Sequence, residues 1–155
     1  MKKKSLSAKK IIPRNFNFKK ILNNKKIFKI YTNFVKNFED LDNPSKIAVS
    51  VSGGSDSMAL CFLILCYKFQ KNKKIQPFFY LVDHRLRENS EQEALFVKKQ
   101  LRLKKISLKI LKWREKKPTS NLQSLARKKR YELIFEECKK KNIPIVLTGH
   151  HQEDV

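Results

Sequence analysis

The chain has 155 residues, and its hydrophobic content of 41% is enough for one packed globular domain. Its 36 lysines and arginines against 14 aspartates and glutamates give a formal charge of +22, which favours a polyanionic partner, most simply a nucleic acid. The three cysteines form no C-x-x-C pair, which argues against a disulfide scaffold or a zinc site, and no apolar run approaches the length of a bilayer span. We therefore expect a soluble protein of a reducing compartment, the cytoplasm, with no membrane partner.

Residues 1–43 are rich in lysine and lack glycine, and we interpret them as a basic extension that precedes a domain at residues 44–155. Apolar residues at helical spacing predict one helix from about Ile21 to Phe38, docked on the domain with a solvated lysine face. Residues 1–20 contain a proline and are interpreted as a basic arm that contacts RNA phosphates. The alternative for the charge of the whole chain is that its many lysines reflect genome composition rather than binding.

From Lys46 onward the sequence alternates between predicted strands and predicted helices. The strands are expected at residues 46–51, 77–82, 107–113 and 143–148, and the helices at residues 58–69, 90–102 and 120–141. Capping boxes at Ser90 and Ser120 are expected to begin the second and third helices. This alternation predicts an α/β fold, a Rossmann-like parallel sheet with helices on both faces, and lysines in the third strand indicate an edge position. On the last helix an i, i+3, i+4, i+7 stripe is expected to face the core: Tyr131, Ile134, Phe135 and Cys138.

A serine- and glycine-rich hexamer joins the first strand to the first helix. It consists of Ser52, Gly53, Gly54, Ser55, Asp56 and Ser57. The two glycines can adopt positive φ and leave room for a phosphate, while the free N–H groups and the dipole of the helix attract an anion. The serine hydroxyls can donate to that anion, and Asp56 can hold a Mg²⁺ that accompanies it. The sequence lacks the Walker motif with its lysine and also lacks G-x-G-x-x-G, so the hexamer is neither of these phosphate-binding loops. The alternative to an anion site is a serine- and glycine-rich turn with an incidental aspartate.

Two further polar clusters follow predicted strands, at residues 83–87 and 149–154. Because parallel strands end at one edge of a sheet, these clusters are expected to meet the hexamer there, with Asp83 and His84 beside a nucleotide base and ribose. His150 and His151 with the carboxylates that follow could hold a transition metal, but carboxylates favour Mg²⁺ and a nucleotide. Arg127 and Arg130 lie one turn apart on a helix and either bind phosphate or form a solvated face.

Taken together, these segments resemble the tRNA(Ile)-lysidine synthetases, which are N-type ATP pyrophosphatases with a PP-loop. The family pattern S-G-G-x-D-S, V-D-H-G-L-R, Q-x-x-A-R-x-x-R-Y and H-H-x-D-D is matched in order over about residues 46–155. Arg85 departs from the glycine of the second block, and Glu153 departs from the first of the paired aspartates. The resemblance implies ATP and Mg²⁺ as cofactors, and adenylation of C2 of the wobble cytidine in tRNA(Ile) with a CAU anticodon. Free L-lysine would then displace AMP, with pyrophosphate released earlier.

The resemblance also implies roles for individual residues. Gly53 and Gly54 would hold pyrophosphate, and Asp56 and Asp154 would bind Mg²⁺. Arg127 would stabilise the adenylate, His150 would lie near the reacting base, and a carboxylate such as Glu153 or Asp154 would take a proton from the lysine amine. A homodimer is left open. Family members continue beyond the matched region, which implies that these 155 residues are a fragment that makes no lysidine alone.

Three other readings fit parts of this pattern. Two-thiocytidine tRNA thiolases share the hexamer but depend on cysteine pairs that this sequence lacks. The GMP, NAD and asparagine synthetases share it too, but their small-molecule substrates do not call for a charge of +22. A non-catalytic RNA-binding remnant would keep the basic surface without ATP binding. A nucleotide-binding assay separates the remnant from the enzymes.

Overall fold

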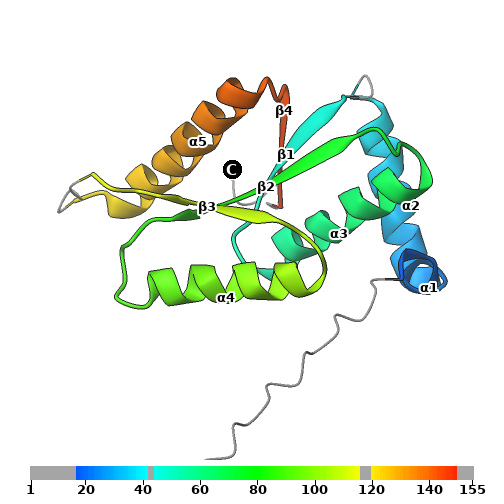
Figure 1. Ribbon diagram of the computed structural model, residues 1–155, viewed down its shortest axis with the longest axis horizontal. Helices are drawn as coiled ribbons and strands as arrows, with labels where there is room; N and C mark the ends of the chain where they lie inside the picture. The colour runs from blue at the N-terminus through cyan, green and yellow to red at the C-terminus, as the bar shows by residue number, and fades with distance from the viewer. Residues whose placement is uncertain (1–16, 42–43, 116–119, 150–155) are drawn as a thin grey trace, which may run out of the picture.

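The computed structural model describes residues 17–41, 44–115 and 120–149 (Figure 1). The helices are α1 (Phe18–Leu22), α2 (Lys25–Glu39), α3 (Ser55–Gln70), α4 (Ser90–Leu103) and α5 (Leu122–Lys141). The strands are β1 (Lys46–Ser50), β2 (Gln76–Asp83), β3 (Leu108–Lys112) and β4 (Ile145–Thr148). Within these ranges no helix combines the length and the apolar character that crossing a membrane requires.

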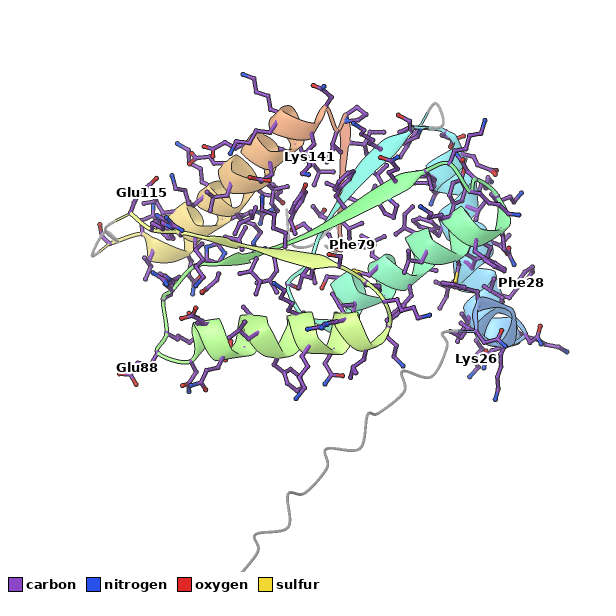
Figure 2. All side chains as sticks on the ribbon, in the orientation of Figure 1. Lys26, Phe28, Phe79, Glu88, Glu115 and Lys141 are labelled. Atoms are coloured by element: carbon purple, nitrogen blue, oxygen red, sulfur yellow. The ribbon has the colours of Figure 1, made fainter. Side chains whose placement is uncertain are left out.

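The four strands form one parallel sheet in the order β3-β2-β1-β4, with helices on both faces (Figure 1). This confirms the predicted fold class and the edge position of β3. Successive residues of β1 alternate between the faces: Ile47 and Val49 pack with α2, α3 and α4, whereas Ala48 packs with α5. Figure 2 shows Phe79 in the interior, whereas Lys26 and Phe28 project outward from α2. The sheet is therefore covered on both sides, as its nearly continuous apolar strands require.

The prediction of a single helix from Ile21 to Phe38 is wrong, because the chain breaks into α1 and α2. Asn24 causes the break: its backbone is extended, and its side-chain oxygen accepts from the N–H groups of Lys26 and Ile27 at 3.0 and 3.2 Å. An asparagine in this geometry is a helix N-cap. The predicted docking is confirmed, since Phe38 is buried with its ring edge-on to Tyr67 of α3, 4.7 Å between centroids.

Neither predicted capping box forms. Ser90 is the first residue of α4 and follows Asn89, whose φ of −89° and ψ of 1° are not the extended geometry of a capping residue. The N-cap of α5 is Asn121, which is left-handed, and no side chain caps either helix. The hydroxyl spacing was present in the sequence, but the backbone before each helix does not place an oxygen over the free N–H groups.

The core stripe of α5 is narrower than predicted. Ile134 and Cys138 are buried against the sheet, but Phe135 is 54% exposed and stacks on Tyr131 with ring centroids 5.9 Å apart. The prediction for Phe135 is therefore wrong. The outer strand β4 is half-buried at all four residues, so the sheet offers α5 less surface on that side than an interior strand would.

The three cysteines are buried. Cys61 and Cys66 lie in α3 and Cys138 in α5, and none is in a disulfide. Burial raises the pKa of the Cys61 thiol to about 12 and that of Cys66 to about 11. Since the thiolate is the reactive form, these cysteines are packing residues of the core.

Candidate functional site

The loop between β1 and α3 turns at one glycine, not two. Gly53 has a φ of +88°, and a Cβ added there would lie 2.8 Å from Cγ2 of Val97 on α4. Gly54 is extended, with φ −72° and ψ 162°, and serves as the N-cap of α3. The expectation that both glycines provide positive φ is therefore wrong. Gly53 makes the turn, and Gly54 lacks the side chain that would cover the start of the helix.

Two serine hydroxyls hold the loop in shape. The buried Ser57 hydroxyl donates to the carbonyl oxygen of Gly54 and accepts from the backbone N–H of Ser52, both at 3.1 Å. The hydroxyls of Ser52 and Ser57 are 3.0 Å apart, and since the single proton of Ser57 is directed at Gly54, Ser52 is the donor of that pair. Both hydroxyl protons are thus used inside the loop.

Helix α3 begins at Ser55, three residues earlier than the sequence predicted, so its first turn contains Ser55, Asp56 and Ser57. No side chain caps this helix start. The N–H groups of the first turn lack partners within the helix, and the helix dipole adds positive potential at this end. The turn at Gly53 and the uncapped start of α3 therefore have the arrangement that suits an anion such as phosphate.

The end of β4 packs directly against this helix start. A Cβ added to Gly149 would lie 2.7 Å from the backbone N of Ser57 and 2.9 Å from the carbonyl carbon of Asp56. Only glycine fits such an approach of backbone to backbone. The carboxyl ends of β1 and β4 are therefore in contact, as expected for parallel neighbours. His150 and Asp154, which follow Gly149 in the sequence, lie outside the described residues.

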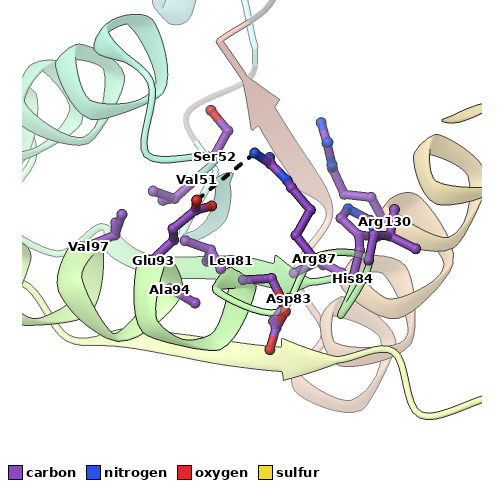
Figure 3. A pocket seen from close by; sticks show the side chains of 13 residues that line it. Val51, Ser52, Leu81, Asp83, His84, Arg87, Glu93, Ala94, Val97 and Arg130 are labelled. Atoms are coloured by element: carbon purple, nitrogen blue, oxygen red, sulfur yellow. Dashed lines mark ion pairs between the residues drawn. The ribbon is translucent and has the colours of Figure 1, made fainter.

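A cavity of about 220 Å³ lies beside the loop, between the ends of β1 and β2 and helix α4. Figure 3 shows Ser52 at one side of this cavity, Arg87 and Glu93 paired across it, and His84 with Arg130 at the other side. The Arg87–Glu93 pair is 4.0 Å long and exposed, so it adds little stability and can open for a ligand. The cavity lies at the carboxyl edge of the sheet, where ligands bind in such folds.

Asp83 and His84 line this cavity. Asp83 is 3% exposed, and its Oδ1 accepts from the backbone N–H of Arg85 at 3.0 Å. Its Oδ2 is buried with no hydrogen-bond partner among the described residues. The His84 ring lies edge-on to Trp113, with centroids 6.2 Å apart. Trp113 was missed in the sequence because it follows β3 and reaches the site only through strand pairing.

Arg85 has a φ of +53°, a left-handed conformation. This is the position where the second block of the resemblance has glycine. The turn thus keeps the backbone geometry that glycine favours, and an arginine carries the strain.

The two arginines of α5 lie differently with respect to the cavity. Arg130 lines the cavity with His84, and sequence reasoning placed it only as a neighbour of Arg127. Arg127 is exposed in the second turn of α5 and is not among the residues that line this cavity. Asp56 is exposed beside the loop, and its Oδ1 accepts from the Ser55 hydroxyl at 3.3 Å. Within the described ranges no three acidic, histidine or cysteine side chains gather as a metal cage.

Residues 23–155 match the PP-loop domain family. The chain belongs to this family. The fold is also that of a U34-tRNA thiolase, NcsA, from Methanococcus maripaludis, with a TM-score of 0.58 and 18% identity over 70% of this chain and 39% of that one. The thiolase was solved with its [4Fe-4S] cluster, and at this identity the likeness shows the fold alone.

The relatives of this PP-loop chain include tRNA(Ile)-lysidine synthases, which confirms the resemblance. The enzyme of Bartonella henselae is 38% identical over 109 residues, 70% of this chain and 22% of the relative. The enzyme of Rickettsia bellii is 38% identical over 128 residues, which cover 81% of this chain and 29% of the relative. The enzyme of Wolbachia pipientis wMel is 40% identical over 113 residues, which cover 71% of this chain and 26% of the relative. The chain thus spans about a quarter of the length of these relatives.

Proposed function

We propose that this PP-loop chain is the nucleotide-binding part of a tRNA-modifying ligase of the tRNA(Ile)-lysidine synthase type. The observation that carries the proposal is the turn at Gly53, which leads into the uncapped start of α3 beside the cavity lined by Asp83 and His84. The similarity to tRNA(Ile)-lysidine synthases supports the substrate class. ATP would bind with its phosphates at the loop and its adenosine in the cavity.

The chemistry of the loop is suited to binding pyrophosphate as the leaving group of ATP. It supplies backbone N–H groups and a helix dipole but no lysine, so it stabilises negative charge on the β- and γ-phosphates without a fixed cation. Asp56 fits a Mg²⁺ that is bound by one carboxylate and by the phosphates, which is the usual manner of binding this ion. The ion would supply neutralisation of phosphate charge. We propose that AMP is transferred and pyrophosphate is released.

The remaining roles concern the base and the nucleophile. Arg127 and Arg130 would place guanidinium groups near the α-phosphate, where they stabilise the adenylate. His150 would lie near the wobble cytidine of a tRNA(Ile) with a CAU anticodon. A carboxylate such as Glu153 would bind the ε-amine of free L-lysine and take its proton before the attack on C2. We also propose the basic arm at residues 1–20 as an RNA contact, Asp154 as a second Mg²⁺ ligand, and a cytoplasmic location.

Equilibrium binding tests the nucleotide part. The 155-residue chain is titrated with ATP and Mg²⁺, and pyrophosphate is expected to compete because it takes the place of the leaving group. Asp56→Asn should weaken the Mg²⁺ dependence of binding, whereas Asp40→Asn, an exposed carboxylate at the end of α2, should not. ATP binding that neither pyrophosphate nor Asp56→Asn affects would place the nucleotide elsewhere. Where turnover with tRNA and lysine is seen, labelled ATP should yield AMP and pyrophosphate, and ADP as the sole product would contradict the proposal.

A further inference from the structure

Helix α4 carries a stripe of cations that the nucleotide site does not use. Lys98, Arg102 and Lys105 follow one another at i, i+4 and i+7, the spacing of one side of a helix and its C-terminal turn. Together they line a hollow of about 280 Å³ where α4 turns into β3. The rest of its lining is apolar or neutral: Ile106, Ser107 and Leu108. No carboxylate lines this hollow, so its potential is positive.

This hollow continues toward the nucleotide site. Lys98 also lines a second hollow of about 250 Å³, which lies between α4 and the edge strand β3. Asp83 and Ala94 line the second hollow and also the cavity beside the loop. Figure 1 shows α4 and β3 running side by side over this distance. We call the two hollows together the α4–β3 track, and it leads from the far end of α4 to the carboxyl edge of the sheet.

The charges of the α4–β3 track are only partly compensated. Lys112 pairs with Glu91, and Lys109 pairs with Glu137 of α5, so the lysines of β3 have acidic partners. In the part of the chain that the structure describes, Lys98 makes no ion pair.

Arg102 also makes no ion pair with a described residue. The dipole of α4 accounts for cations in its last turn, such as Arg102, but that effect falls off within one turn. It does not account for Lys98, which lies a full turn earlier.

We propose that the α4–β3 track binds the sugar-phosphate backbone of the RNA substrate and directs the strand toward the nucleotide site. This inference rests on the proposed function, which supplies an RNA as substrate. Lys98 and Arg102 lie about 6 Å apart along the helix axis, so both can contact neighbouring phosphates of one strand. Arg102 adds a guanidinium fork that matches phosphate oxygens, and Lys98 adds a point charge. Contacts of this kind position a strand without reading its sequence.

The test compares two pairs of substitutions with the same spacing and charge. Lys98→Gln with Arg102→Gln removes two charges from the α4–β3 track. Lys25→Gln with Lys29→Gln removes two charges, also at i and i+4, from the exposed face of α2. Glutamine keeps a high helix propensity at all four positions. The probe is a labelled RNA hairpin with CAU in its loop, titrated against each 155-residue chain at several NaCl concentrations.

The track variant is expected to bind RNA more weakly and with a smaller salt dependence. The slope of log K against log salt should fall by about 1.4 to 1.8, since each lost phosphate contact changes it by about 0.7 in single strands and about 0.9 in duplexes. The α2 variant should keep the slope of the wild type. All three chains should bind ATP equally, which shows that the fold and the nucleotide site are intact.

Three results would overturn the inference. Equal weakening by both pairs would mean that RNA responds to total charge and not to the track. An unchanged slope in the track variant would mean that the strand lies elsewhere. Competition by polyglutamate as strong as by RNA would mean that the track accepts any polyanion. In each case ATP binding, with pyrophosphate competition, would leave the nucleotide part of the proposed function standing, whereas loss of ATP binding in the wild type would count against that function itself.

Discussion

Gly53 is the residue of the loop whose backbone excludes a side chain most strongly. Its φ of +88° is costly for any other residue, and a Cβ would also push against Val97 on α4. We expect Gly53→Ala to lower the free energy of unfolding by about 1 to 3 kcal/mol, the usual cost of a residue held in a sparsely populated conformation. The midpoint of urea unfolding measures this cost.

Gly54→Ala is the matched control for this change. Gly54 is extended, and its added Cβ would lie 3.4 Å from Oγ of Ser52, so alanine needs only a small adjustment. The loss should be about 1 kcal/mol or less, the cost of replacing a glycine N-cap by alanine, with no added strain from a positive φ. If Gly54→Ala destabilised the chain as much as Gly53→Ala, the positive φ would be assigned to the wrong glycine.

Arg85 offers the opposite case, a side chain where the backbone favours glycine. Its left-handed conformation costs about 1 to 2 kcal/mol, while glycine loses about 0.5 to 1 kcal/mol in chain entropy, so Arg85→Gly should be neutral or stabilising by up to about 1.5 kcal/mol. Arg87→Gly, at a position without positive φ, should destabilise by about 0.5 to 1 kcal/mol. Thermal unfolding of both variants decides the point, and a clear loss of stability in Arg85→Gly would mean that its side chain contributes more than the turn costs it.

Among helices, α2 and α4 differ in how they begin, and substitution should reveal the difference. Asn24→Ala removes the oxygen that accepts from two N–H groups, so it should cost about 1 kcal/mol, within the range of about 0.5 to 2 for such caps. Ser90→Ala should change stability by less than about 0.5 kcal/mol, because Ser90 caps nothing. Urea unfolding of the two variants measures both effects. A larger loss of stability for Ser90→Ala would mean that Ser90 does cap α4, as the sequence predicted.

Helix α3 and its thiols make stability depend on alkaline pH. An unfolded cysteine ionises near a pKa of about 8.5, whereas burial raises the pKa of Cys61 to about 12 and of Cys66 to about 11. Above the unfolded pKa the unfolded chain binds fewer protons than the folded chain, so the free energy of unfolding falls as pH rises from about 8 to about 10. In Cys61→Ala the chain is less stable overall, but the decline with pH should be shallower. Equal slopes in both chains would show that the buried thiol does not cause the decline.

The elements of the sheet were predictable because buried parallel strands are short apolar runs that recur between amphipathic helices. The starts of α4 and α5 were predicted within two residues, but the capping residues Asn24, Asn89 and Asn121 were not, because a cap depends on the backbone angles before it and several polar residues stand near each start. The loop residues and Asp83 were predicted as site residues from the sequence because their types are chemically specific. Val97 and Trp113 were not, because they reach the site only when α4 and β3 pack beside β2.

At the scale of the whole molecule, the excess of 36 basic over 14 acidic residues makes most charge pairs repulsive. Such self-repulsion destabilises a compact state, and salt weakens it because the screening length falls from about 10 Å at 0.1 M to about 3 Å at 1 M. We therefore expect the midpoint of unfolding in urea to rise with NaCl. Urea is the suitable denaturant because it is uncharged, and NaCl avoids the general stabilisation that sulfate gives.

RNA should reverse this dependence on salt. An RNA that binds the folded chain stabilises it by mass action, and that binding weakens as salt rises. With RNA in excess, the midpoint should therefore be highest at low salt and should approach the RNA-free value at high salt. The Lys98→Gln and Arg102→Gln pair should shrink the RNA-dependent gain more than the Lys25→Gln and Lys29→Gln pair does. A midpoint that falls with NaCl in the absence of RNA would show that the eight ion pairs found within the described residues outweigh the repulsion of the +22 charge.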